Sequence, residues 1–178
     1  GTLLAGWEDG SLCAYDLRSA NSGSEMAPAC SRKLHSEPVL AIDVDAACRA
    51  VVTGGADRAV RVVALRAADA GEGAASASAF GADVAELPIP VTNEASGAGG
   101  IASIRVRPDG KILASGGWDR RVRLWQWGGG KRGAKHKPLA VLREHTGTVH
   151  AVDFSACSRW LASASEDKTV ALWSLYRD

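Results

Sequence analysis

The sequence predicts an all-β chain in which small antiparallel sheets follow one another. One observation is a repeated turn, in which Asp9, Asp57, Asp119 and Asp167 each stand six residues before an aromatic or bulky apolar residue. Successive members of this series are 48, 62 and 48 residues apart. A second observation is that short runs of β-prone residues alternate with turn residues, whereas helical periodicity is not evident. A motif that recurs at such a period is typical of repeat architectures.

Each repeat is expected to supply three or four short strands. In the segment TVALWSL near the C-terminus, Val170 and Leu172 alternate with Ala171 and Trp173. Because apolar residues on both faces of a strand indicate that both faces are covered, each sheet is expected to be sandwiched between its neighbours. The expected strands are Thr2–Ala5, Leu12–Leu17, Cys30–Leu34, Pro38–Val44, Ala50–Thr53, Ala59–Leu65, Ala82–Ile89, Ile101–Val106, Lys111–Ser115, Arg121–Trp127, Pro138–Arg143, Thr148–Phe154, Arg159–Ser163 and Thr169–Leu175.

These strands divide a single domain into repeats at about residues 1–35, 36–96, 97–143 and 144–178. The first repeat lacks its first strand, the last lacks its fourth, and the chain opens without methionine. We therefore expect a fragment whose missing strand lies upstream of Gly1. The segments within 67–100 and 128–137 are rich in small residues or in glycine and lysine, and they are expected to be flexible surface inserts.

Composition and charge argue against several classes of function. The 21 basic and 20 acidic residues give a net charge of +1, which favours neither nucleic acid nor an anionic membrane as a partner. No run of 18 apolar residues is present to span a bilayer. The cysteines form no closely spaced pair, so we expect reduced thiols in the cytoplasm or nucleus, and neither a metal nor a cofactor. They are Cys13, Cys30, Cys48 and Cys157.

One set of residues combines the side-chain types of a hydrolase triad. Ser163 and Asp167 follow His145 by 18 and 22 residues. A catalytic nucleophile, however, needs a single site with an oxyanion hole and a substrate cleft. Repetition of the arrangement therefore favours a structural role and leaves a hydrolase as an alternative. The same spacing recurs in an earlier repeat, at His35, Thr53 and Asp57.

A structural role for these residues has a clear physical basis. A tight turn between two strands buries polar groups, and each group left without a hydrogen bond costs about 1–3 kcal/mol. The aspartate can accept hydrogen bonds from turn amides and from the histidine ring. The hydroxyl can link the histidine to the indole N–H of a tryptophan. Such a network is expected to fix one conformation of the turn.

The order His, Ser or Thr, Asp and Trp, with the last three at 18, 22 and 28 residues after the first, resembles the structural tetrad of WD-repeat β-propellers. The pattern is complete only in the last repeat, where Trp173 is its fourth member. The resemblance implies a partial WD-repeat β-propeller of about four blades, a fragment of a ring of about seven, within the usual range of ~4–8. The other repeats are degenerate and retain Asp9 with Tyr15, Asp57 with Val63, and Ser115, Asp119 and Trp125 with Gly97 in the place of the histidine.

Four stretches carry a narrower resemblance: LAGWEDGS at 4–11, IRVRPDGK at 104–111, GGWDRRVR at 116–123 and LASASEDKTVALWSLY at 161–176. Together they resemble the C-terminal half of the guanine nucleotide-binding protein β-subunit-like protein 1 family, which includes the fungal ASTRA-associated protein and the plant Decreased Size Exclusion Limit protein. The resemblance implies a non-enzymatic adaptor. It also implies work with chaperone-linked complexes that mature phosphatidylinositol-3-kinase-like kinases, and with chromatin-associated assemblies.

Propeller blades expose their turns on a common face, so residues that flank each turn aspartate are the candidates for partner contact. Trp7 and Trp118 stand out because aromatic residues anchor many interfaces; alternatively, their rings pack over the neighbouring blade. A basic loop at 131–137 could touch phosphate, which keeps a chromatin or nucleic-acid reader as an alternative. We expect protein partners in a multisubunit complex, with no small-molecule substrate and no membrane insertion. The candidate contact residues are Trp7, Glu8, Arg58, Trp118, Arg120, Glu166 and Lys168.

Overall fold

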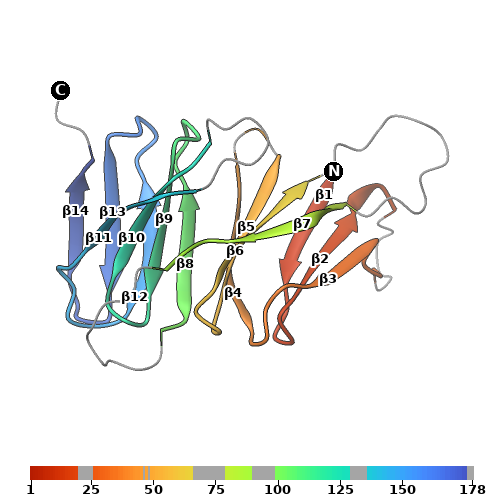
Figure 1. Ribbon diagram of the computed structural model, residues 1–178, viewed down its shortest axis with the longest axis horizontal. Coiled ribbons are helices and arrows are strands. Elements are labelled where there is room, and N and C mark those ends of the chain that lie inside the picture. Colours follow the sequence, from red (N-terminus) through yellow and green to blue (C-terminus); the bar gives the residue numbers. More distant parts are fainter. Residues whose placement is uncertain are drawn as a thin grey trace.

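A computed structural model describes residues 1–19, 26–45, 47, 49–65, 79–89, 99–128 and 136–175. Within these residues the chain forms four antiparallel sheets and one short 3₁₀ helix, so the all-β prediction is confirmed. The sheets stand side by side in chain order (Figure 1). The predicted inserts lie largely outside the described residues, as do Cys48 and Gly97. In the described part of the chain, no helix has the length and apolar character needed to cross a membrane.

Each sheet is a meander in which consecutive strands pair. The first sheet contains β1 (Thr2–Gly6), β2 (Ser11–Asp16) and β3 (Cys30–Lys33), with the 3₁₀ helix η1 (Leu17–Ser19) after β2. The second contains β4 (Val39–Val44), β5 (Ala50–Gly55), β6 (Val60–Leu65) and β7 (Phe80–Glu86). The third contains β8 (Ile101–Val106), β9 (Ile112–Gly117), β10 (Val122–Gln126) and β11 (Pro138–Leu142). The fourth contains β12 (Val149–Phe154), β13 (Trp160–Ser165) and β14 (Val170–Ser174).

The first strands of successive sheets are neighbours, because β4 contacts β8 and β8 contacts β12. Polar contacts join them across the sheet boundaries. The Val106 amide donates to Asp43 Oδ2 at 2.7 Å, and the Val152 amide donates to Ser103 Oγ at 3.1 Å. The sheets are therefore held in a fixed order along one side, and their later strands extend outward from it.

Three apolar cores lie between the sheets. Along β5 and β9 alternate residues enter different cores, with Val51 and Val52 on opposite faces of β5 and Ile112 and Leu113 on opposite faces of β9. Both faces of the second and third sheets are thus covered, as the apolar character of their strands predicts. The central core consists of Val52, Val60, Val62, Leu87, Ile101, Ile104, Leu113, Trp125 and Trp127.

The last strand departs from the prediction that both faces are covered. Val170 and Leu172 of β14 are 71% and 64% exposed, whereas Trp173 packs against the core between the third and fourth sheets. The prediction was wrong for this strand because, among the described residues, no sheet lies over the face that carries Val170 and Leu172. Figure 1 shows β14 at the end of the row.

Predicted strand bounds agree with the structure to within two residues, except at the end of β7. Strands β5 and β9 end two residues later than predicted, because Gly54 and Gly116 pair within the ladder instead of starting the turn. A Cβ on Gly54 would lie 2.6 Å from Cγ2 of Ile101, and one on Gly116 would lie 2.6 Å from Cγ1 of Val149. These glycines allow the next sheet to approach closely.

Strand β7 was predicted at Ala82–Ile89 and lies at Phe80–Glu86. It begins earlier because Phe80, which is 2% exposed, pairs with Leu65 and packs into the core between the first two sheets. It ends earlier because Pro88 has no amide proton to donate to a neighbouring strand.

Candidate functional site

The fourth sheet brings together the residues of the complete tetrad. His145 precedes β12, Ser163 lies on β13, and Asp167 is in the turn between β13 and β14. Nδ1 of His145 lies 3.0 Å from Oδ2 of Asp167, and its Nε2 lies 2.8 Å from Oγ of Ser163. The indole of Trp173, on β14, donates to the same Ser163 oxygen at 2.9 Å. Because a carboxylate can only accept, Nδ1 carries the proton that the histidine donates to Asp167.

Asp167 also closes its own turn. Its carboxylate accepts from the backbone amides of Thr146 and Thr169, each at 2.9 Å, and from the Thr169 hydroxyl at 2.5 Å. The hydrogen bond from that hydroxyl, together with those from the amides and from the His145 ring, outweighs desolvation and holds the pKa of Asp167 well below its usual range. The ionised carboxylate is therefore part of the folded turn.

The second sheet repeats this arrangement with one new member. His35 Nδ1 lies 2.8 Å from Asp57 Oδ1, and its Nε2 lies 2.8 Å from Thr53 Oγ1. Arg61 of β6 adds a cation, with Nη1 2.8 Å from Asp57 Oδ2 and Nη2 2.9 Å from Oε2 of Glu86. Arg61 was not predicted as a member of this cluster, although an arginine four residues after the turn aspartate recurs as Arg123 in the third sheet.

Burial and neighbouring charges set the protonation of this second cluster. Burial lowers the pKa of His35 despite its hydrogen bond to Asp57, and the nearby Arg61 guanidinium lowers it further. For Asp57, burial raises the pKa, but hydrogen bonds from Arg61 and His35 more than offset this and bring it to about 2. His35 is therefore neutral and Asp57 ionised near neutral pH, so their contact is a hydrogen bond and the ion pair is that between Asp57 and Arg61.

The third sheet does not assemble a tetrad from its described residues. Asp119 pairs with Arg123 of β10, whose Nη1 lies 3.1 Å from Asp119 Oδ1. The Trp125 indole donates to the Pro88 carbonyl at 3.1 Å, and the buried Ser115 Oγ has no hydrogen-bond partner among the residues that the structure describes. Ser115 and Trp125 are thus not joined to each other as the spacing predicts. The position of the missing histidine, Gly97, lies outside the described residues.

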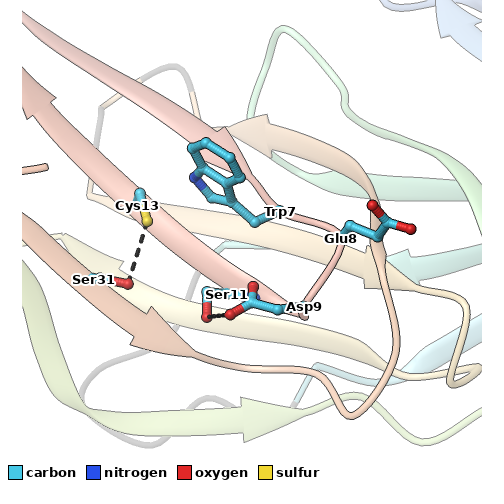
Figure 2. A pocket seen from close by; sticks show the side chains of 6 residues that line it. All are labelled: Trp7, Glu8, Asp9, Ser11, Cys13 and Ser31. Atoms are coloured by element: carbon cyan, nitrogen blue, oxygen red, sulfur yellow. Dashed lines mark hydrogen bonds between the residues drawn. The ribbon is translucent and has the colours of Figure 1, made fainter. Parts of the chain in front are cut away.

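In the first sheet, the hydrogen bonds of Asp9 to described residues lie within its own turn. Asp9 accepts from the Ser11 amide and from the Ser11 hydroxyl, both at 2.9 Å. These two bonds lower the pKa of Asp9. Figure 2 shows these residues at the edge of an open hollow, where the Cys13 thiol lies 3.2 Å from Ser31 Oγ. The hollow is lined by Trp7, Glu8, Asp9, Ser11, Cys13 and Ser31.

The distances in the fourth sheet would fit a catalytic triad, but the surroundings do not. Ser163 is 1% exposed and His145 is 3% exposed. The Ser163 oxygen already accepts the Trp173 indole N–H, and the same His and hydroxyl pair is buried in the second sheet with threonine in place of serine. A nucleophile must reach its substrate, and this hydroxyl is enclosed by its own sheet. What the arrangement does chemically is satisfy buried polar groups beside a turn.

The candidate contact residues occupy equivalent turns of the four sheets. Arg58, Arg120 and Lys168 each follow a turn aspartate and have φ angles of 69°, 68° and 69°, which is the left-handed region. Trp7 is 50% exposed. Trp118 is 39% exposed, and its ring lies against Gly100, where a Cβ would come within 2.9 Å of it. Trp118 therefore packs on one side and faces solvent on the other.

We expect the free energy of unfolding to fall as the pH drops below about 6.5, the ordinary pKa of histidine. Because folding lowers the pKa of His35, the unfolded chain binds that proton more readily, and stability is lost as the pH falls through this range. Asp57 adds a second loss between its ordinary pKa of 3.8 and about 2. Urea midpoints measured across this pH range test the expectation.

The substitution His35→Gln is the control for this pH dependence. It should flatten the loss between neutral pH and pH 5 without abolishing it, because burial also lowers the pKa of His136. If the urea midpoint of the wild-type protein does not change with pH, the assignment of His35 as a buried neutral ring is wrong.

Comparison with known proteins agrees with this geometry. The family model described as WD domain, G-beta repeat matches residues 91–126 and 136–174, which include the third and fourth sheets. The chain carries WD40 repeats. The partial WD-repeat propeller expected from the tetrad is thereby confirmed, with its polar clusters at the turns of the blades.

Relatives of this WD-repeat chain match the narrower resemblance. It is 34% identical over 174 residues to guanine nucleotide-binding protein subunit beta-like protein 1 of Mus musculus, a match that covers 98% of the chain and 44% of the relative. It is 29% identical over 211 residues to ASTRA-associated protein 1 of Verticillium alfalfae, covering 98% of the chain and 47% of that relative. It is 32% identical over 144 residues to ASTRA-associated protein 1 of Schizosaccharomyces pombe, a match that covers 81% of the chain and 34% of that relative. The chain spans less than half the length of each relative.

Proposed function

We propose that this WD-repeat chain is part of a non-enzymatic scaffold that binds other proteins through the edge formed by its aspartate turns. The observation that carries the proposal is the contrast between the two sets of polar residues at these turns. The His and hydroxyl groups are buried and are hydrogen-bonded to one another and to the half-buried Asp57 and Asp167, whereas neighbouring residues such as Trp7, Arg58 and Lys168 are exposed. The buried set fixes the turns, and the exposed set is free to contact a partner.

The relatives suggest the kind of assembly. Two of them are named ASTRA-associated protein 1, so the proposed partners are subunits of a multiprotein complex in the cytoplasm or nucleus. A role beside chaperone-linked complexes that mature phosphatidylinositol-3-kinase-like kinases, or in chromatin-associated assemblies, is the finer form of this proposal. It is supported by the family resemblance of the motifs. In this role the chain transforms no substrate.

Replacing both Trp7 and Trp118 with alanine is expected to reduce capture of partner proteins about tenfold or more, because exposed aromatic residues commonly anchor interfaces. The melting temperature should change by only about 3 °C, because both rings are partly exposed and contribute little to the core. The measurement is affinity capture by the tagged full-length protein, with quantitative mass spectrometry of the captured proteins.

Trp160→Ala is the matched control, since Trp160 is 42% exposed on β13 and lies outside the aspartate turns. Capture by this variant should equal that of the original protein. If the turn variant instead lost thermal stability and kept its partners, Trp7 and Trp118 would be packing residues and the proposed edge would be wrong.

A further inference from the structure

One patch on the proposed edge combines an aromatic ring with two arginines. It consists of Arg58 in the β5–β6 turn, and Trp118 and Arg120 in the β9–β10 turn, and is called the Trp118 patch below. The two turns meet at the glycine pair that precedes β8. A Cβ on Gly99 would lie 3.7–3.8 Å from Cγ, Cδ and Nε of Arg58, and one on Gly100 would lie 2.9–3.0 Å from the Trp118 ring. The side chains of Arg58 and Trp118 therefore contact the adjacent residues Gly99 and Gly100.

The two arginines of the patch have no ion-pair partner among the described residues. The nearby aspartates interact with other groups. Asp57 is hydrogen-bonded to His35 and forms an ion pair with Arg61, and Asp119 forms an ion pair with Arg123. The positive charges of Arg58 and Arg120 are therefore not neutralised within the described chain. An uncompensated pair of cations beside an exposed ring favours a partner that brings carboxylates.

The patch is held in place before any partner arrives. Arg58 and Arg120 have left-handed backbone angles imposed by their turns, and Arg58 N and Arg120 N donate to the carbonyls of Gly55 and Gly117 at 3.3 and 3.2 Å. Trp118 donates its own amide to the Gly100 carbonyl at 2.9 Å while its ring rests on that residue. A preorganised surface loses less entropy on binding than a flexible one does.

The turns on either side of the patch limit what can bind. The first sheet places the exposed carboxylate of Glu8 on this edge, and the fourth places that of Glu166 there. An extended polyanion such as duplex DNA would meet these carboxylates as it passed along the edge, whereas a short segment would contact the arginines alone. The net charge of +1 also provides no long-range attraction for nucleic acid.

We infer that the Trp118 patch binds an acidic segment of a partner protein, with Asp or Glu side chains paired to Arg58 and Arg120 and an apolar group against the Trp118 ring. The inference rests on the proposed function and names the chemistry of the partner. Arginine suits this role because its planar guanidinium pairs with a carboxylate through two parallel hydrogen bonds.

The left-handed turn position supplies variants that should keep the fold. The first sheet has Gly10 at the equivalent position, with φ 88°, and glycine adopts this region without strain. Arg58→Gly and Arg120→Gly together remove both cations from the patch. Lys168→Gly is the matched control, because Lys168 occupies the same turn position in the fourth sheet, with φ 69°, but lies outside the patch. None of these variants should lower the urea midpoint.

The test is selection of a phage-displayed library of random short peptides on the full-length protein, followed by counter-selection on the Arg58→Gly, Arg120→Gly variant. Peptides retained by the original protein and lost by this variant should be several-fold enriched in Asp and Glu. Their measured affinity should fall about tenfold or more in the double variant and stay within about twofold in Lys168→Gly. Replacing their Asp and Glu by Asn and Gln should abolish binding.

Four results would contradict the binding of an acidic segment by the Trp118 patch. If no acidic peptides are enriched, or if Lys168→Gly weakens them as much as the double variant does, the acidic-segment assignment is wrong. It is also wrong if single-stranded oligothymidylate binds the patch more tightly than the peptides, which would make the ligand a nucleic acid. Protein capture that depends on Trp118 but is unchanged in the double glycine variant would overturn this inference and leave the scaffold proposal standing.

Discussion

Replacing Asp57 with alanine is expected to lower the free energy of unfolding by about 2–4 kcal/mol. The carboxylate accepts from the His35 ring, from Arg61 and from the Ala59 amide at 3.1 Å, and its side chain is only 8% exposed. Without it, the buried His35 N–H has no acceptor and Arg61 loses one of its two carboxylate partners. Urea unfolding, with the slope checked for two-state behaviour, measures the loss.

Asp153→Ala is a suitable control for this loss, because the Asp153 side chain is 77% exposed and its nearest cation, Arg105, is 3.6 Å away. We expect a change of less than about 0.5 kcal/mol there. The loss of unfolding free energy for Asp57→Asn should lie between those for Asp57→Ala and Asp153→Ala, because asparagine keeps an acceptor for His35 but loses the charge opposite Arg61. Equal midpoints for Asp57→Ala and Asp153→Ala would show that the turn cluster does not stabilise the blade.

Ser163→Ala is expected to cost about 1–3 kcal/mol of unfolding free energy. The serine oxygen links His145 Nε2 at 2.8 Å to the Trp173 indole at 2.9 Å, and the site is 1% exposed. Removing it leaves two polar nitrogens beside a small apolar gap. Thr53→Ala in the second sheet provides a direct comparison, because Thr53 contacts His35 Nε2 at the same distance but no tryptophan.

The same serine variant separates a structural role from catalysis. A structural hydroxyl predicts lower stability whether or not a substrate is present. If Ser163→Ala abolished an ester or peptide hydrolysis by the purified protein while its urea midpoint stayed unchanged, the serine would be a nucleophile and the proposed scaffold role of the chain would be wrong.

The repeat could be predicted from the sequence because its spacing is fixed by geometry. The distances of 18 and 22 residues from histidine to hydroxyl and aspartate reflect one hairpin of constant length, so His35 and His145 could be matched to their partners before any coordinates. Apolar residues at consecutive positions likewise indicated strands that are covered on both faces, because side chains in a strand alternate between faces. This holds for β5 and β9 but not for β14, where Val170 and Leu172 are exposed.

Other features depend on contacts between distant segments and could not be predicted in this way. Gly54 looked like the start of a turn, whereas its role is to let Ile101 of the next sheet approach. The tryptophan at the expected tetrad position in the third sheet, Trp125, donates to the Pro88 carbonyl rather than to Ser115. Pairing of Arg61 with Asp57 follows the register of β5 and β6, which the spacing of the four tetrad residues does not specify.

Hydrogen–deuterium exchange of the full-length protein, alone and in its captured complex, tests most directly whether partners bind the aspartate-turn edge. Slower exchange is expected in the complex for turn amides at 7–11, 56–59 and 118–121, since a bound partner would shield them from solvent. The turns at 107–111 and 155–159 belong to the opposite ends of the strands and should be unchanged. Protection confined to those opposite turns, with none at the aspartate turns, would contradict the proposed binding edge.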